Sequence, residues 1–139
     1  MDYVRKKLVE HGVDPTLICF EITETSAVEN IDNARQFVQA LKLQGCRFSL
    51  DDFGTGMSSY AYLKHLPVDY IKIDGSFIRE ILDSEIDRVM VEMIVKMARV
   101  MNMTVIAECV ESEAIMDVLT KMNVGFAQGY AIARPALFA

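Results

Sequence analysis

Apolar residues recur along the chain in two alternating patterns. Stretches that alternate apolar and polar residues, or are rich in β-branched ones, predict strands at 17–22, 47–51, 69–74, 104–108 and 125–130. Apolar positions three or four residues apart predict helices at 4–10, 31–41, 59–66, 86–100 and 114–122. Strands that alternate with helices are typical of α/β proteins with a parallel sheet. We therefore predict an α/β fold of about five parallel strands with flanking helices. It would form an open doubly wound sheet or part of a β/α (TIM-like) barrel, since a complete barrel takes roughly 250 residues.

The longest helical pattern covers residues 86–100. It begins after Ser84, whose spacing to Asp87 resembles a capping box. Its apolar positions form a Met-rich stripe made of Ile86, Val89, Met90, Met93, Ile94, Met97 and Val100. Because methionine fills irregular gaps in protein cores, we interpret this stripe as a face that packs into the core.

Ionisable side chains stand near the carboxyl ends of four successive predicted strands. In three of these strands the ionisable group lies opposite the purely apolar side, which we expect to face the helices. The set consists of Glu21, Asp51, Asp52, Lys72 and Glu108. Catalytic residues of parallel α/β folds gather at this end of the sheet, so these side chains could converge in one site. Isolated, solvated strand ends or structural ion pairs are the alternative interpretation.

This residue set favours one kind of chemistry if it does converge. Carboxylate oxygens are the ligands that Mg²⁺ or Mn²⁺ prefers, and the adjacent Asp51 and Asp52 suit a bridging role between two metals. A two-metal centre stabilises both the attacking and the leaving oxygen of a phosphodiester. The sequence therefore points to phosphodiester hydrolysis as one possible activity.

Composition and charge exclude some classes of binding partner and bear on the cellular location of the chain. The 139 residues carry a net charge of −6 without a basic stripe, so duplex nucleic acid is not an expected partner. No apolar run approaches the roughly 20 residues that span a bilayer, and no signal-peptide pattern opens the chain. We expect a cytoplasmic segment without membrane contact. Three cysteines without CxxC spacing indicate neither a disulfide framework nor a zinc site.

Five short motifs, in one order and at matching intervals, resemble the EAL domain family of cyclic-di-GMP phosphodiesterases. They read E-[IL]-T-E, D-D-F-G-x-G, K-I-D-x-S-F-[VI], A-E-G-V-E and Q-G-Y in that family. In this chain they correspond to 21–24, 51–56, 72–78, 107–111 and 128–130. The resemblance covers nearly the whole chain and implies a modified β/α barrel that hydrolyses the bacterial second messenger cyclic-di-GMP to linear pGpG.

The resemblance also implies roles for individual residues. Glu21, Asp51, Asp52 and Glu108 would bind two Mg²⁺ or Mn²⁺ ions, with Asp51 as the bridge. Lys72 would orient or help to activate the attacking water, and Gln128 would assist near that water or the substrate. The supporting positions are Glu24, which would hold the Asp51–Asp52 loop, Glu111 on the same face, and Gly54 and Gly56 near the substrate.

Several departures from the family pattern bear on activity. The Glu-Ala-Leu motif, the Arg that follows it and the metal-binding Asn are absent, so residues 1–139 would be the C-terminal portion of a single EAL domain. Cys109 replaces a Gly, and Gly125 stands where an Asp is common. We expect the metal site to be incomplete and the chain alone to be inactive. Completion would come from the missing segment or from a homodimer. The alternative is a non-catalytic module that binds cyclic-di-GMP or a protein, and a ligand-free scaffold is a third reading.

Overall fold

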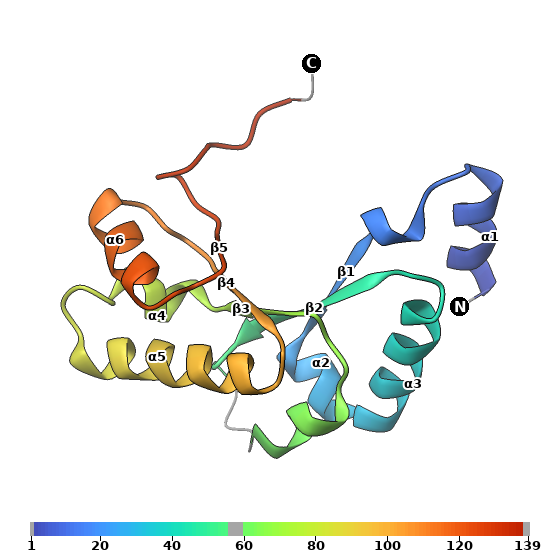
Figure 1. The fold of residues 1–139 in the computed structure, drawn as a ribbon, viewed down its shortest axis with the longest axis horizontal. Helices are drawn as coiled ribbons and strands as arrows, with labels where there is room; N and C mark the ends of the chain where they lie inside the picture. The colour runs from blue at the N-terminus through green and yellow to red at the C-terminus, as the bar shows by residue number, and fades with distance from the viewer. Residues whose placement is uncertain (1, 56–59, 138–139) are drawn as a thin grey trace.

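A single sheet of five parallel strands organises the protein. The computed structural model describes residues 2–55 and 60–137. The strands follow one another in the sheet in sequence order (Figure 1). They are β1 (Cys19–Thr23), β2 (Arg47–Phe53), β3 (Tyr70–Ile73), β4 (Thr104–Ala107) and β5 (Phe126–Ala127). All four neighbouring pairs are parallel, which confirms the predicted sheet.

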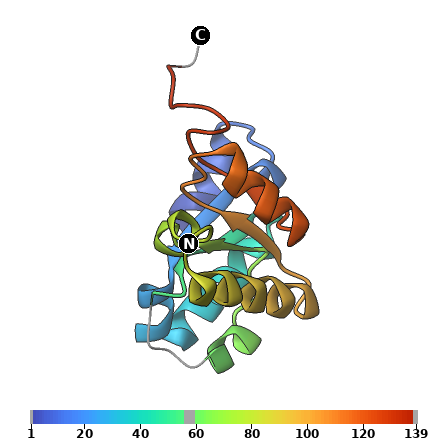
Figure 2. The same cartoon turned by 90° about the vertical axis from the view of Figure 1, so that its left-hand side faces the viewer.

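Helices connect the strands. They are α1 (Asp2–Glu10), α2 (Glu24–Glu29), α3 (Ile31–Lys42), α4 (Gly75–Arg79), α5 (Glu85–Val100) and α6 (Glu113–Lys121). Two 3-10 helices, η1 (Pro15–Leu17) and η2 (Tyr60–His65), complete the set in the described residues. Figure 2 shows the same arrangement from the side. None of the helices in the described part of the chain is both long enough and apolar enough to cross a bilayer.

The sequence patterns missed two short helices, α2 and α4. Each starts at the end of a strand, and its first turn is capped by a side chain of the strand itself or of the next residue. Thr23 Oγ1 accepts from the Ser26 amide at 3.3 Å, and Asp74 Oδ1 accepts from the Ser76 amide at 2.9 Å. Such caps satisfy amides that the helix cannot pair internally, so a helix of one or two turns forms without a long apolar period.

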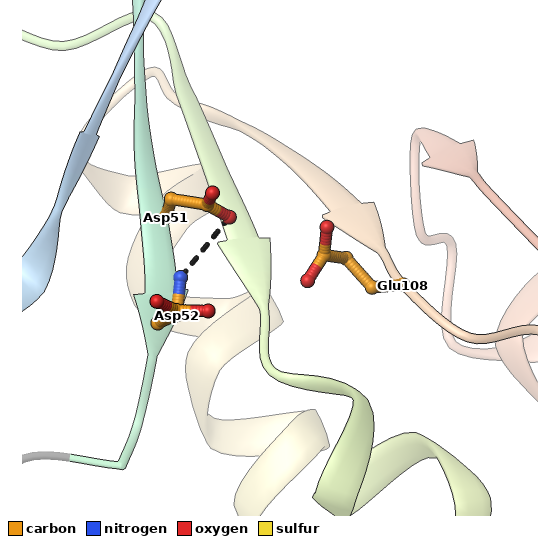
Figure 3. A group of neighbouring side chains, drawn as sticks. All are labelled: Asp51, Asp52 and Glu108. Atoms are coloured by element: carbon orange, nitrogen blue, oxygen red, sulfur yellow. Dashed lines mark hydrogen bonds between the residues drawn. The ribbon is translucent and has the colours of Figure 1, made fainter.

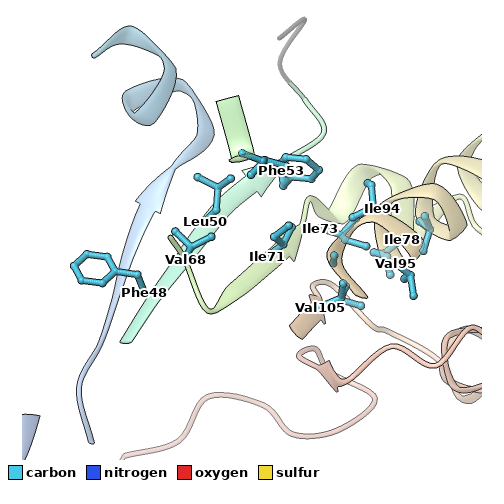
Figure 4. Close-up of a cluster of buried hydrophobic side chains, with 14 of the residues drawn as sticks. Phe48, Leu50, Phe53, Val68, Ile71, Ile73, Ile78, Ile94, Val95 and Val105 are labelled. Carbon is cyan, nitrogen blue, oxygen red and sulfur yellow. The ribbon is translucent and has the colours of Figure 1, made fainter. Parts of the chain in front are cut away.

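The core lies between the sheet and the helices. In β3, Ile71 and Ile73 are buried on the helix-facing side, and Lys72 between them reaches the carboxylates at the strand ends. The buried cluster in Figure 4 joins the strands to α5. It includes Phe48, Leu50, Phe53, Ile71, Ile73, Val105, Ile94 and Val95. The opposite side of the sheet carries a hollow of about 330 Å³, lined in part by Glu21, Ser49 and Tyr70.

The interpretation of the Met-rich stripe as one buried face is wrong for four of its seven members. Four of its members are exposed to solvent: Ile86 (77%), Val89 (46%), Met93 (53%) and Val100 (83%). The buried residues of α5 are Val91, Ile94, Val95 and Ala98. Because α5 carries apolar residues on more than one side, a spacing of three and four fits two different faces, and only packing decides between them.

This difference predicts a contrast between two identical substitutions. Ile71→Val removes one buried methylene and is expected to lower the free energy of unfolding by about 0.5–1.5 kcal/mol. Ile86→Val, at a position that is 77% exposed, is expected to change it by less than about 0.5 kcal/mol. Urea denaturation followed by circular dichroism measures both. Equal losses of stability would mean that the Ile86 side chain is buried in solution and not exposed as in the structure.

Candidate metal centre

Lys72 stands at the centre of a cluster of carboxylates. Its Nζ lies 2.8 Å from Glu108 Oε1, 3.0 Å from Asp51 Oδ1 and 3.2 Å from Glu21 Oε2. Lys72 lies in β3, and Glu108 directly follows β4. Asp51 lies in β2 and Glu21 in β1. Parallel pairing aligns these strand ends, as the pairing of Thr23 with Asp51 and of Ile73 with Ala107 shows. The side chains predicted to converge do so.

The surroundings of Lys72 fix its charge. Burial of the ammonium lowers its pKa, but the hydrogen bonds that it donates to Glu108, Asp51 and Glu21 outweigh burial and raise the pKa above its ordinary value. Lys72 therefore stays protonated at neutral pH. A protonated amine donates hydrogen bonds and screens the carboxylates from one another, whereas it cannot accept a proton as a general base.

Three carboxylates lie close enough together to share a metal ion. One oxygen each from Asp51, Asp52 and Glu108 falls within 4.8 Å of the others (Figure 3). Asp51 and Asp52 are neighbours in a strand, where side chains normally point to opposite faces. Asp52 has a φ of 55°, and the pairing of β2 with β3 shifts register between Leu50 and Phe53. This local irregularity brings both carboxylates to one place, and a set of hard oxygen ligands fits Mg²⁺ or Mn²⁺.

Glu21 is linked to this group through Lys72 and not directly. Its carboxylate bonds to Lys72, yet it does not belong to the set within 4.8 Å. Its side chain is about half exposed, so it has room to reorient. Glu21 thus lies at the edge of the site, and Asp51, Asp52 and Glu108 form its centre.

Glu24 supports the loop that follows Asp52. It is 2% exposed, and its carboxylate accepts from the Gly54 amide at 3.0 Å and from the Tyr62 hydroxyl at 2.8 Å. Gly54 has a φ of 102°, and a Cβ there would come within 2.9 Å of the Phe77 ring. These hydrogen bonds place Glu24 against the loop after Asp52, and its role in the reaction stays a prediction. The motifs did not single out Tyr62, because its hydrogen bond to Glu24 joins residues that are distant in the sequence and produces no periodic pattern.

Among the described residues, no hydrogen bond or ion pair joins the side chains of Gln128 and Glu111 to this centre. The side chains of Gln128 and Glu111 are exposed and make no hydrogen bond to another described residue. The Gln128 backbone is hydrogen-bonded to the end of β4 and the residues after it. Its amide donates to Ala107 O at 2.8 Å, and its carbonyl accepts from the Val110 amide at 3.0 Å. Gly56 lies outside the described residues.

Cys109, next to Glu108, occupies a left-handed backbone position with a φ of 53°. Glycine adopts this conformation at lower cost than a residue with a side chain, so the position itself is suited to glycine. The Cys109 thiol lies 3.1 Å from an Arg79 guanidinium nitrogen and packs against Gly75, where a Cβ would collide with the sulfur. The chain accommodates cysteine because Gly75 provides the space.

The chain matches the EAL domain family over residues 1–135. It belongs to the EAL family. The curated relatives include the cyclic di-GMP phosphodiesterase PdeB of Shewanella oneidensis, 41% identical over 97% of this chain and 16% of the relative. The cyclic di-GMP phosphodiesterase PdeA of Borreliella burgdorferi is 40% identical over 96% of this chain and 20% of the relative. The chain thus spans about a fifth or less of these relatives.

Solved EAL structures share the fold. The phosphodiesterase PaMucR in complex with c-di-GMP superposes with a TM-score of 0.91 and 38% identity, over 96% of this chain and 54% of the other. Klebsiella pneumoniae BlrP1, as a manganese and c-di-GMP complex, has a TM-score of 0.89 and 29% identity, over 97% of this chain and 34% of the other. EAL domains are TIM-barrel-like, so the five strands form part of such a barrel, which confirms that prediction over the open doubly wound sheet.

Proposed function

We propose that the cluster at the strand ends is the divalent-cation site of an EAL domain that hydrolyses cyclic-di-GMP to linear pGpG. The observation that carries this proposal is the approach of Asp51, Asp52 and Glu108 to within 4.8 Å beside a protonated Lys72. The names of the curated relatives and the ligands of the related structures support the substrate and the metal.

The position of each residue suggests a separate role in metal binding or in orienting the reactants. Asp51, Asp52 and Glu108 would hold Mg²⁺ or Mn²⁺, and Glu21 would join them by turning from Lys72. When bound, such ions lower the pKa of a coordinated water and neutralise charge on the scissile phosphate. Lys72 donates hydrogen bonds, and it would orient the attacking water or a phosphate oxygen.

The outer residues would assist in the same reaction. Glu24 would hold the loop after Asp52, and Gln128, the residue after β5, would contact the water or the substrate. Glu111 would support the same face, and Gly54 and Gly56 would allow the loop backbone to approach the substrate. The exposure of Gln128 and Glu111 leaves their side chains free to reach a ligand.

Metal binding tests the site directly. In calorimetric titration with Mn²⁺, Asp51→Asn is expected to weaken binding by about tenfold or more, because the neutral amide loses a charged ligand. Asp117→Asn is the matched control, since Asp117 is an exposed acid on α6. Equal Mn²⁺ affinity in the two variants would show that the cluster is not the cation site.

Turnover tests the reaction. Cyclic-di-GMP is incubated with Mn²⁺ and either this chain or the domain built to the length of its structural relatives, and pGpG is measured by chromatography. We expect turnover in the complete domain, its loss in Asp51→Asn, and little or none in the 139-residue chain. The rival function, binding without hydrolysis, predicts binding in Ca²⁺ and no pGpG from the complete domain. The Cys109 and Gly125 departures are the observations that favour this rival.

A further inference from the structure

The outer surface of α5 carries an apolar row that the fold leaves uncovered. Its members are Ile86, Val89, Met93 and Val100, which are all about half exposed or more. Their spacing of three, four and seven residues places them on one side of the helix. An exposed apolar strip of this length on a charged helix is a mark of an interaction surface.

A basic row runs beside it. Arg88, Lys96 and Arg99 of α5 and Lys121 of α6 line a groove of about 550 Å³. Val95, Val118 and Met122 provide its apolar part, and Glu92 is its one acidic residue among the described residues. Lys96 is the member of the basic row next to the apolar row, because it is three residues from Met93 on the helix surface. Both helices are at the front in Figure 2.

The cations of this groove lack acidic partners in the described part of the chain. No ion pair there involves Lys96, Arg99 or Lys121, although the chain has 20 acidic residues and a net charge of −6. Arg88 differs, because its guanidinium donates to the carbonyls of Ile81 and Leu82 at 3.1–3.2 Å. Unpaired cations beside an exposed apolar row favour a ligand that is both acidic and apolar.

We propose that this face of α5 and α6 docks an acidic amphipathic helix of a partner protein. The apolar row extends from residue 86 to 100, about 21 Å along the helix axis. That length matches about four turns of a partner helix and exceeds the size of a single phosphate. Apolar side chains of the partner would cover Val89, Met93 and Val100, and its acidic flank would pair with Lys96 and Arg99. This is the helix-in-groove mode of recognition, with charge complementarity to set the orientation.

The part of the docking face around Val95 and Arg99 lies toward the amino ends of the strands, away from the metal centre. A second hollow shares Val95, Arg99 and Asn123 with the groove and continues to Thr104 and Gly125. Thr104 begins β4 and Gly125 precedes β5, whereas the carboxylates stand at the carboxyl ends of the strands. A helix on the outer side of α5 would leave the metal site open, because Ile71 and Ile73 face the helices while Lys72 between them reaches the carboxylates from the other side of the strand. The proposal does not depend on the hydrolytic function.

A designed peptide serves as the probe. It has 21 residues, leucines at helical spacing and glutamates on the flanks, and the matched control keeps the same composition with the leucines scrambled. Fluorescence anisotropy at physiological salt, without metal or nucleotide, is expected to give micromolar binding of the amphipathic peptide. We expect binding about tenfold weaker for the scrambled peptide, for Lys96→Glu with Arg99→Glu, and for Met93→Asp. Arg5→Glu with Lys6→Glu, on α1, makes the same charge change elsewhere and should leave the affinity unaltered.

Three results would overturn the proposal. The first is binding that the α1 pair of substitutions weakens as much as the α5 pair does, since that is a general charge effect. The second is equal binding of the two peptides, which would leave the apolar row without a role. The third is self-association in analytical ultracentrifugation that Lys96→Glu with Arg99→Glu abolishes, because the occupant is then a second copy. Circular dichroism checks that each variant is folded. Lys121→Glu, in the same groove but on α6, is also expected to weaken binding of the amphipathic peptide.

Discussion

Lys72→Met is expected to lower the free energy of unfolding by roughly 3 kcal/mol and, at the same time, to tighten binding of Mn²⁺. Removing the ammonium leaves Glu21, Asp51 and Glu108 close together without the charge that screens them. Breaking a buried ion pair by deleting one partner costs about 3–5 kcal/mol. The lower end applies here because the carboxylates keep contact with solvent, whereas Lys72 is 7% exposed. Divalent cations then replace the missing charge, so their affinity rises.

Two measurements separate these effects. Urea denaturation with a chelator present gives the loss of stability, and the same titration in Mn²⁺ should recover most of it, because the ion binds the folded state. Lys7→Met is the control, since Lys7 forms an exposed pair with Glu10 and such pairs contribute less than about 1 kcal/mol. Weaker Mn²⁺ binding in Lys72→Met would mean that the ammonium helps to assemble the metal site and does not compete with the metal for it.

The convergence of the site could be predicted from sequence because it follows from topology. Parallel strands in sequence order carry their carboxyl ends to one edge, so Glu21, Asp51, Lys72 and Glu108 had to approach one another once the strands were assigned. The motifs added the family, which the match over residues 1–135 confirmed. Neither argument required side-chain packing, and that is why both succeeded.

Packing and backbone detail decided the rest. The positive φ of Asp52, which brings two adjacent carboxylates together, depends on the irregular pairing of β2 with β3. The Tyr62 contact with Glu24 joins residues 38 positions apart. The exposed face of α5 arises because two of its faces are apolar and the sheet can cover only one. Each of these depends on which surfaces meet in three dimensions, and sequence spacing does not record that.

Glu24→Ala is expected to destabilise the chain by about 2–4 kcal/mol and to weaken Mn²⁺ binding although Glu24 is not a predicted ligand. The Gly54 amide and the Tyr62 hydroxyl each lose a charged acceptor in a site that is 2% exposed. A buried donor that loses its acceptor costs about 1–3 kcal/mol. The loop after Asp52 then loses its anchor, so Asp52 is held less firmly towards Asp51 and Glu108.

Glu24→Gln distinguishes an electrostatic role from a structural one. Glutamine keeps one carbonyl oxygen as an acceptor but brings an amide that cannot accept, so it should restore part of the stability and part of the Mn²⁺ affinity. Glu29→Ala, at an exposed position of α2, controls for removal of a carboxylate from the same helix. Unchanged Mn²⁺ affinity in a destabilised Glu24→Ala would show that the loop keeps its shape without this anchor. Because the proposed metal ligands and the anchor lie on different elements, the site would then depend on the strand ends alone.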